Sequence, residues 1–219
     1  MNFTQCRENM VEGQIQTNGV TEPSILGAYR AIPRERFVMP GQESISYCDE
    51  SLPIGAGRCL MEPMVHARLL QAAAPKSDDV VLDIGGATGY SAAVFSSLVS
   101  TVVSVEKDPD FLARAEALWQ ELGLCNVVGL QGELKAGDPR HAPYDLIFFN
   151  GAVASVSDDI LAQVDIGGRL VAVVMPSGAS VGKAVKMTRT GEDDFSSEFL
   201  FDVYTPYLPG MGARTEFVF

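Results

Sequence analysis

Short apolar runs alternate with helix-like segments from residue 79 onward, and this alternation constrains the fold more than any other feature of the chain. The runs are rich in β-branched residues and show no regular polar–apolar alternation. Strands of this kind are covered on both faces, as in a parallel sheet flanked by helices. We therefore predict an α/β fold with a Rossmann-like, doubly wound and mostly parallel sheet. Its strands are expected at residues 80–84, 102–105, 127–130, 146–149 and 170–174.

The rest of the chain supplies helices before and between these strands and a hairpin after them. Helices between the strands are expected at residues 90–98, 109–122 and 158–164. Residues 1–40 have amphipathic helical spacing interrupted at Asn18-Gly19, and a further helix is expected from Glu62-Pro63 to about residue 73. Residues 39–61 are expected to be loop-rich, and the proline and glycines of 52–57 exclude a regular element there. Residues 184–188 and 199–204 are expected to pair as an antiparallel hairpin. We expect residues 1–78 to form N-terminal helices and an acceptor-side loop, packed as one unit on a cofactor-binding domain of residues 79–219.

Charge and composition narrow the classes of partner. The formal net charge is −12, from 28 acidic and 16 basic side chains. A surface of this sign repels nucleic-acid phosphates and anionic membranes, so we expect neither as a partner. The N-terminus lacks the apolar segment of a signal peptide, and no apolar run approaches the roughly 20 residues of a membrane span. We therefore expect a cytoplasmic protein. The chain has four cysteines, without a C-x-x-C pair, and only two histidines. This set argues against a zinc site.

The most informative motif joins the first predicted strand to the helix after it. Asp83 stands near the end of the strand and is followed by Gly85, Gly86, Gly89 and Tyr90. Glycines in such a turn let the backbone approach a ligand closely. Nicotinamide enzymes have the spacing G-x-G-x-x-G, whereas this chain has G-G-x-x-G with a carboxylate two residues earlier. That carboxylate suits a cofactor bearing an ammonium and a sulfonium. The alternative is a tight turn without a ligand.

A second acidic residue, Glu106, ends the next predicted strand. A carboxylate at this position can accept hydrogen bonds from both ribose hydroxyls of a nucleoside. Glu106 follows Asp83 at about the distance that such a unit requires. The alternative is a solvated carboxylate at a strand end. We expect Asp83 and Glu106 to lie on the same edge of the sheet, facing an open crevice, with Asn150 at the end of the fourth predicted strand.

This ordered set of motifs resembles the class I methyltransferases, which use S-adenosylmethionine. The N-terminal part is similar to one family within them, the protein-L-isoaspartate (D-aspartate) O-methyltransferases. The resemblance rests on residues 10–15 (MVEGQI), 31–38 (AIPRERFV) and 52–55 (LPIG), and on Glu62-Pro63. It implies S-adenosylmethionine as the cofactor and methylation of the α-carboxylate of isoaspartyl residues in damaged proteins. The residues assigned to the cofactor are Asp83, Gly85, Gly86, Gly89, Tyr90, Glu106, Lys107, Glu133 and Asn150.

The sequence departs from the family pattern where the acceptor would bind. The family has a segment resembling G-Q-T-I-S-Q-P, whose serine and threonine hydroxyls lie near the acceptor. Here Cys59 takes the threonine position and Met61 the serine position. A thioether cannot donate a hydrogen bond and a thiol donates only weakly. The family's G-D-G after the third strand is replaced by Gly132-Glu133-Leu134, and Ala87 stands at a glycine position.

The residues assigned to the acceptor side are therefore Arg58, Cys59 and Met61, each with an alternative. Arg58 replaces the lost hydroxyls by pairing with a carboxylate, or it is a solvated loop residue and the repair activity is gone. Cys59 is a nucleophile or, without a nearby histidine dyad, a structural thiol. His66 matches a position where the family has histidine, or it is an ordinary helix residue.

The function expected from these observations is methyl transfer to a carboxylate of a protein or peptide. One alternative is a methyltransferase for another acceptor, such as a small molecule or a different protein carboxylate. The other is a non-catalytic family member that binds the cofactor or a protein partner. The sequence does not indicate the oligomeric state. The last twenty residues are expected either to cover the site or to mediate association.

Overall fold

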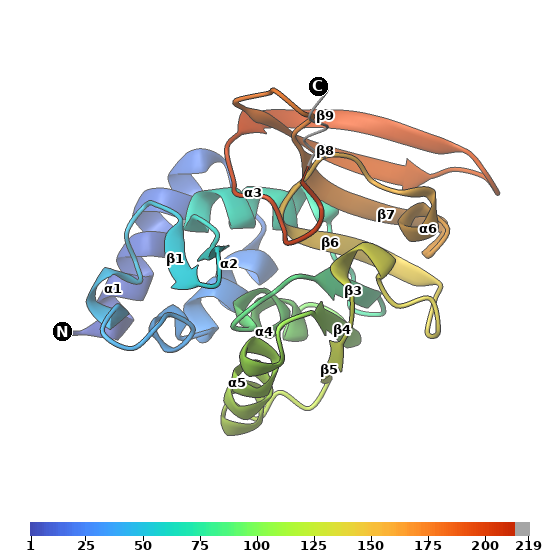
Figure 1. Ribbon diagram of the computed structural model, residues 1–219. Coiled ribbons are helices and arrows are strands. Elements are labelled where there is room, and N and C mark those ends of the chain that lie inside the picture. Colours follow the sequence, from blue (N-terminus) through green and yellow to red (C-terminus); the bar gives the residue numbers. More distant parts are fainter. Residues whose placement is uncertain (213–219) are drawn as a thin grey trace, which may run out of the picture.

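The computed structural model describes residues 1–212 and has a seven-stranded sheet at its centre (Figure 1). The strands lie in the order β5-β4-β3-β6-β7-β8-β9. Strands β3 to β7 are parallel to their neighbours, and β8 and β9 are antiparallel additions. The strands are β3 (Val80–Ile84), β4 (Thr101–Glu106), β5 (Val127–Gln131), β6 (Tyr144–Val153), β7 (Val164–Val174), β8 (Gly182–Arg189) and β9 (Phe195–Val203). The predicted mostly parallel sheet and its C-terminal hairpin are confirmed.

Alternate residues of the central strands enter two separate hydrophobic cores, one on each face of the sheet. Val81 and Phe148 belong to the core beneath the N-terminal and central helices. Their neighbours Leu82 and Phe149 belong to the opposite core, which holds the short α6 and the segment around Leu134. Because successive side chains of a strand point to opposite faces, an uninterrupted apolar run is what this arrangement requires.

The helices α1 to α5 gather on one side of the sheet, and α6 lies on the other (Figure 1). Three of them begin with proline, which is pre-organised for a first helical turn and lacks only an N–H that would be unpaired there. None of the helices within residues 1–212 has the length and apolar composition needed to cross a membrane. The helices are α1 (Phe3–Met10), α2 (Pro23–Ala31), α3 (Pro63–Ala73), α4 (Tyr90–Ser96), α5 (Pro109–Glu121) and α6 (Asp158–Leu161).

The N-terminal helical region is interrupted more than the periodicity suggested. A π-helical turn, Val11–Ile15, and a 3-10 turn, Gln16–Asn18, follow α1 directly and end at Gly19. Further 3-10 turns lie at Arg34–Arg36 and Glu43–Ile45. Buried residues of this region share one core with the sheet. The domain boundary between residues 78 and 79 stays a prediction.

The expectation that residues 52–57 exclude a regular element is wrong. Residues Leu52–Gly55 form β1 and Arg58–Leu60 form β2, which pair as a short antiparallel hairpin outside the main sheet. The proline is tolerated because each strand has only one partner, so an N–H is not required on the outer side. The glycine-containing turn that argued against a strand is the turn of this hairpin.

Three smaller differences concern the main sheet. Strand β5 is an edge strand and is not covered on both faces, since Val128 is 48% exposed. The helix expected at residues 158–164 is only the short α6. The strand expected at residues 170–174 begins earlier, because Gly167-Gly168 lies within β7, where the pairing with β6 shifts register. Each difference comes from tertiary pairing, which local sequence does not encode.

Candidate functional site

The two predicted carboxylates, Asp83 and Glu106, lie on the same edge of the sheet, at the ends of neighbouring parallel strands. Strand β3, which carries Asp83, has β4 on one side and β6 on the other. The chain crosses from β3 to β4 in one direction and later returns to β6 in the other. Ligands of open α/β sheets bind at the carboxyl edge at such a switch point. The expected juxtaposition of Asp83 and Glu106 is therefore present.

Asp83 is a fully buried carboxylate held by three uncharged side chains. Its Oδ1 accepts hydrogen bonds from Ser91 Oγ at 2.6 Å and from Asn150 Nδ2 at 2.7 Å. Its Oδ2 accepts one from Ser104 Oγ at 3.2 Å. Burial raises the pKa of Asp83 from 3.8 to about 6, and the three hydrogen bonds oppose the rise. The side chain is thus ionised at neutral pH without a cation beside it.

The glycine-rich turn folds closely over this carboxylate. Gly85 has a φ of +73°, which only glycine adopts without strain. A Cβ added to Gly86 would lie 2.6 Å from Asp83 Oδ2, so a side chain there would displace the carboxylate. The N–H of Ala87 donates to Glu106 Oε2 at 2.9 Å and ties the turn to the second strand end.

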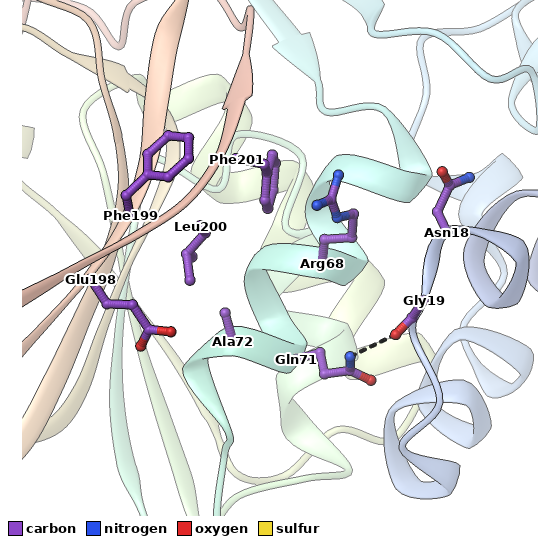
Figure 2. A pocket seen from close by; sticks show the side chains of 9 residues that line it. All are labelled: Asn18, Gly19, Arg68, Gln71, Ala72, Glu198, Phe199, Leu200 and Phe201. Carbon is purple, nitrogen blue, oxygen red and sulfur yellow. Dashed lines mark hydrogen bonds between the residues drawn. The ribbon is translucent and has the colours of Figure 1, made fainter.

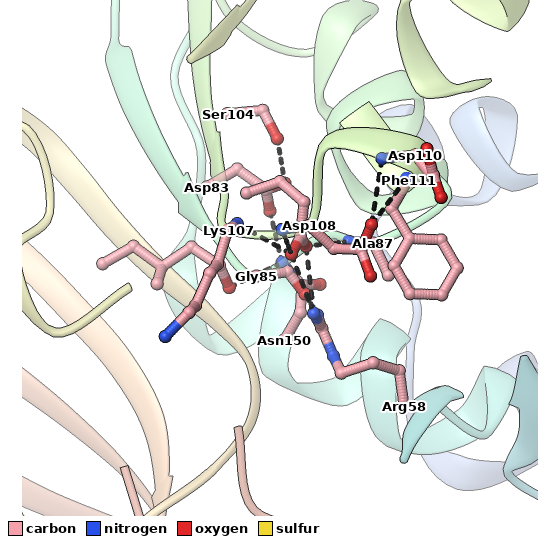
Figure 3. Close-up of polar contacts among 12 residues, drawn as sticks. Arg58, Asp83, Gly85, Ala87, Ser104, Lys107, Asp108, Asp110, Phe111 and Asn150 are labelled. Carbon is pink, nitrogen blue, oxygen red and sulfur yellow. Dashed lines mark hydrogen bonds and ion pairs between the residues drawn. The ribbon is translucent and has the colours of Figure 1, made fainter. Parts of the chain in front are cut away.

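Glu106 is held from both sides, and one of its partners is Arg58. The N–H groups of Lys107 and Asp108 donate to Oε1 at 2.8 and 3.0 Å. Arg58 Nη1 lies 3.0 Å from Oε1 and 3.1 Å from Oε2, and Nη2 donates to the carbonyl of Gly85 (Figure 3). The side chains of Arg58 and Glu106 are 5% and 2% exposed. The interpretation of Arg58 as a solvated loop residue is wrong.

The crevice is filled, not open as expected. Arg58 enters it from the hairpin, and Leu208 enters it from the C-terminal segment. A Cβ added to Gly85 would meet Leu208 Cδ2 at 2.8 Å and Arg58 Nη2 at 3.3 Å. Backbone hydrogen bonds of 2.9 Å between Ala152 and Leu208 and between Ala152 and Pro206 hold this segment against β6. Of the last twenty residues, the segment that contains Pro206 and Leu208 therefore covers the site. Residues 213–219 lie outside the described residues.

A small cavity of about 10 Å³ remains beneath the covering side chains. It brings the predicted acceptor residues and cofactor residues together, because its lining includes Cys59, Met61, Gly85, Gly86, Tyr90 and Asn150. Its volume is at the lower limit for a single water molecule. Arg58 and Leu208 must move before a cofactor can reach Glu106 and Gly85.

Two polar atoms that line this cavity have no hydrogen-bond partner within residues 1–212. They are His66 Nε2 and the hydroxyl of Tyr90, both on buried side chains. Burial, with a contribution from Arg34, lowers the pKa of His66 to about 3, so the ring is neutral. Its Nδ1 is bonded to the hydroxyl of Tyr29, whose own pKa is raised well above 10 by burial. The Tyr29 hydroxyl and a neutral imidazole can pair in either direction, so His66 Nε2 is a donor or an acceptor according to the tautomer. Unpaired buried polar atoms of this kind fit a ligand with polar groups.

The remaining predicted residues lie at the rim or on the walls. Lys107 Nζ pairs with Glu133 Oε2 at 3.0 Å, and both side chains are about half exposed. Cys59 is partly exposed, and burial raises the pKa of its thiol, which disfavours the thiolate that a nucleophile requires. Met61 is buried, and its carbonyl accepts a hydrogen bond from Arg34 Nη2 at 2.8 Å.

Several residues that shape the site were not predicted. Arg34 is fully buried, bonds the carbonyls of Ser46 and Met61, and lies with its guanidinium 5.0 Å from the ring centroid of Tyr90. Its only sequence signal was its place in the R-E-R-F-V block. Ser91 and Ser104 hold Asp83, and their positions in the helix and strand next to Asp83 could have suggested this role. No sequence signal pointed to Leu208.

A larger hollow of about 470 Å³ lies between α3 and β9 (Figure 2). Its wall contains Phe199 and Phe201, with the guanidinium of Arg68 3.7 Å from the ring centroid of Phe201. It contains neither the glycine-rich turn nor a strand-end carboxylate. The crevice at Asp83 and Glu106 is therefore the better candidate for chemistry.

Comparison with known proteins agrees with the geometry of this crevice. The family model for protein-L-isoaspartate (D-aspartate) O-methyltransferase matches residues 5–209. Protein-L-isoaspartate O-methyltransferase 2 of Pelobacter propionicus is 38% identical over 210 residues, which cover 95% of this chain and 91% of that protein. Protein-L-isoaspartate O-methyltransferase 1 of Rhodopseudomonas palustris is 37% identical over 213 residues, which cover 96% and 86%.

Solved structures show the same fold over nearly the whole chain. A structure of protein-L-isoaspartate O-methyltransferase superposes with a TM-score of 0.84 at 26% identity and covers 94% of this chain and 67% of its own. A Plasmodium falciparum structure in complex with S-adenosyl-L-homocysteine superposes with a TM-score of 0.77 at 15% identity, covers 94% and 97%, and shares the fold.

Proposed function

The chain belongs to the protein-L-isoaspartate (D-aspartate) O-methyltransferase family, whose members are S-adenosylmethionine-dependent O-methyltransferases, and from this membership we propose that it methylates isoaspartyl carboxylates of proteins or peptides. The observation that carries the proposal is the pair of buried strand-end carboxylates, Asp83 and Glu106, joined by the glycine-rich turn. An acceptor other than nucleic acid is part of this proposal, supported by the net charge of −12. A cytoplasmic location is also part of it, supported by the four free cysteines.

The side chains around the crevice fit S-adenosylmethionine once Arg58 has left Glu106 and Leu208 has moved from Gly85. Asp83 forms no ion pair within residues 1–212, so the cofactor's ammonium would supply a counter-cation. Asn150 Nδ2 bridges Asp83 and the carbonyl of Ile84 and fixes the wall beside them. The unpaired polar atoms of His66 and Tyr90 would meet polar groups of the bound molecules. Glu106 would accept the ribose hydroxyls once Arg58 has left it.

When bound, the cofactor would supply a methyl group on a sulfonium: an acceptor oxygen would bond to the methyl carbon as the carbon–sulfur bond breaks, with S-adenosylhomocysteine as the leaving group. A carboxylate acceptor is already ionised at neutral pH, so the chain needs no general base. Its contribution is to hold the two reactants aligned and to exclude water. Leu208 and Met61 are buried at the two sides of the site and are suited to excluding water.

We assign Arg58, Cys59 and Met61 to the acceptor side. Once Arg58 is released from Glu106, it is the cation best placed to pair with the acceptor carboxylate, because it begins β2 directly beside the cavity-lining Cys59. Cys59 and Met61 would contribute contact surface. The raised pKa of Cys59 argues against a covalent role for its thiol.

A second candidate function is that of a non-catalytic family member, which binds the cofactor or a protein partner without methyl transfer. The Arg58–Glu106 ion pair favours it, because this pair fills the position that a nucleoside would take. Both candidates predict a folded, stable protein, so they must be distinguished by transfer of label.

The test incubates the purified chain with methyl-tritiated S-adenosylmethionine and a peptide that contains one isoaspartyl residue. The same peptide with an ordinary aspartyl residue is the matched control. We expect base-labile label on the isoaspartyl peptide alone, and loss of that label in Glu106→Gln. Label on other material from a cell extract would indicate another acceptor. Binding of cofactor without any transfer would support the non-catalytic candidate and overturn our proposal.

A further inference from the structure

Glu106 has no acceptor capacity left for a ribose. A carboxylate offers about four lone-pair positions to donors. Here Oε1 receives the N–H groups of Lys107 and Asp108 and one contact from Arg58, while Oε2 receives the N–H of Ala87 and a second contact from Arg58. The three backbone donors belong to the turn and the strand end and stay in place. Arg58 is therefore the partner that must leave.

We propose that Arg58 is an internal competitor of the nucleoside cofactor, which occupies the ribose-binding carboxylate Glu106 and sets the affinity of the crevice for S-adenosylmethionine and S-adenosylhomocysteine. The inference rests on the proposed function, since it concerns the same crevice. The inference goes beyond the proposed function because it assigns the control of cofactor entry to Arg58.

The chemistry of the two ligands makes the competition direct. Arg58 Nη1 contacts both oxygens of Glu106, at 3.0 and 3.1 Å, and a ribose hydroxyl would need the acceptor position that this nitrogen takes. The guanidinium contact is charge-assisted and is stronger than hydrogen bonds from neutral hydroxyls. Nη2 also bonds the carbonyl of Gly85, in the turn that a cofactor must approach. Arg58 thus occupies the space as well as the acceptor atoms.

The position of Arg58 at the start of a short strand allows its side chain to leave Glu106. It is the first residue of β2, whose hairpin with β1 forms a separate two-stranded sheet. A change in the Arg58 side-chain torsions breaks no backbone pairing of either sheet, so the hairpin, whose Leu52, Ile54 and Leu60 are buried, can stay in place. Besides its polar contacts, the guanidinium lies 5.9 Å from the ring centroid of Phe111 in α5, which gives a weak additional hold. Figure 3 shows the side chain reaching from the hairpin into the cluster around Gly85.

The test measures binding of S-adenosylhomocysteine by titration calorimetry to the wild-type chain and to Arg58→Ala. We expect the variant to bind at least about tenfold more tightly, because a charge-assisted contact no longer opposes the ligand. Arg58→Lys, which keeps the charge but loses the two-pronged geometry, is expected between the two. Arg30→Ala removes an arginine from a surface pair with Glu8 and is the matched control with unchanged affinity.

A second measurement uses methylguanidinium as a free substitute for the missing side chain. It should weaken binding of S-adenosylhomocysteine to Arg58→Ala and leave the wild-type affinity unchanged. If Arg58→Ala fails to fold, Arg58→Gln replaces it, and it should also bind more tightly than the wild type. Circular dichroism checks the fold of each variant.

The outcomes separate this inference from the proposed function. Tighter binding by the variant, reversed by methylguanidinium, supports both. Binding by the wild type that equals or exceeds that of the folded Arg58 variants overturns the inference and leaves the proposed function standing. No binding to any of these proteins overturns the proposed function itself, and the inference with it.

Discussion

Asp83 is a buried carboxylate whose three side-chain donors are all uncharged, from Ser91, Ser104 and Asn150. These hydrogen bonds do not fully offset the loss of hydration, and the pKa of Asp83 rises to about 6. The native protein therefore binds this proton more tightly than the unfolded chain does. The free energy of unfolding consequently falls as the pH rises from about 4 through about 6, and the loss persists at higher pH.

We expect Asp83→Asn to remove this pH dependence. Two pKa units correspond to about 3 kcal/mol, so the variant should gain roughly 2 to 3 kcal/mol relative to wild type between pH 4 and pH 7.5. Urea denaturation at both pH values measures the difference. Asp193→Asn, at an exposed carboxylate, is the control. A relative stability of Asp83→Asn that does not change with pH would contradict the buried, uncompensated charge.

The same variant should lose affinity for S-adenosylhomocysteine. The charge of Asp83 lowers the free energy of unfolding of the ligand-free protein, but it is expected to bind a cationic group of the ligand. The affinity for S-adenosylhomocysteine should also rise as the pH increases through about 6, because Asp83 ionises over this range. Calorimetric titrations at pH 5 and pH 7.5 check the direction, and an affinity that falls with pH would contradict it.

Among single residues, those whose positions are fixed by the order of strands and turns could be predicted from the sequence. Asp83, Gly85 and Glu106 follow from the order strand, turn, helix, strand, because parallel strand ends meet at one edge. The Arg58–Glu106 pair joins residues 48 positions apart, and the choice of partner depends on how the hairpin docks. Arg58 was singled out, but its partner within the chain was not foreseen.

At the scale of elements, the contact of α4 with α5 passes through Gly89 and Trp119. Gly89 has a φ of +87°, and a Cβ there would lie 2.7 Å from Ala115 Cβ and 2.8 Å from the Trp119 ring. Trp119 Nε1 also donates to the carbonyl of Gly89 at 2.9 Å. The glycine-rich turn is therefore held by helix packing as well as by its own hydrogen bonds.

We expect Gly89→Ala to lower the free energy of unfolding by roughly 2 to 4 kcal/mol, from left-handed strain plus overpacking. Gly123→Ala is the matched control, because Gly123 has a φ of +69° but nothing within 4 Å of its Cβ position. It should lose only about 1 kcal/mol. Fluorescence of Trp119, the sole tryptophan, follows denaturation. Equal losses in the two variants would show that packing at Gly89 is not tight.

Arg169 joins three elements at the opposite end of the sheet. It donates to the carbonyls of Ala73 and Ala74 at the end of α3, both at 2.6 Å, and pairs with buried Asp79 before β3. Arg169→Met should cost about 3 to 5 kcal/mol, because Asp79 is left buried without its partner. Arg36→Met, which breaks an exposed pair with Glu121, should cost less than about 1 kcal/mol. Chemical denaturation of both variants provides the comparison, and similar losses would refute a structural role for Arg169.

The positions and the mostly parallel direction of the main strands could be predicted from apolar runs, whereas their order in the sheet and the β1–β2 hairpin could not. Its residues 52–60 contain turn formers and few residues of high strand propensity, so local preference argued for a loop. Leu52, Ile54 and Leu60 are buried against the N-terminal core, and this burial stabilises the hairpin. The covering position of Leu208 likewise depends on long-range pairing with β6.

At the scale of the whole molecule, the net charge of −12 bears on the choice of acceptor. A protein of this charge attracts cationic peptides and repels anionic ones at low ionic strength. We expect an isoaspartyl peptide flanked by lysines to have a KM several-fold below that of one flanked by glutamates. The ratio should approach one in high salt, where exposed charges are screened. Tritium transfer at two salt concentrations measures it, and a ratio independent of salt would contradict this role of the charge.

In the free protein the side chains of Arg58 and Leu208 fill the crevice, and we expect them to move when the cofactor binds. The most direct measurement follows the guanidinium resonances of Arg58 by NMR in a chain labelled with ¹⁵N-arginine, assigned by their loss in Arg58→Lys. We predict protected signals in the free protein that shift and lose protection when S-adenosylhomocysteine saturates the site. Unchanged, still protected signals with the ligand bound would show that the nucleoside binds without taking Glu106, and would contradict the account.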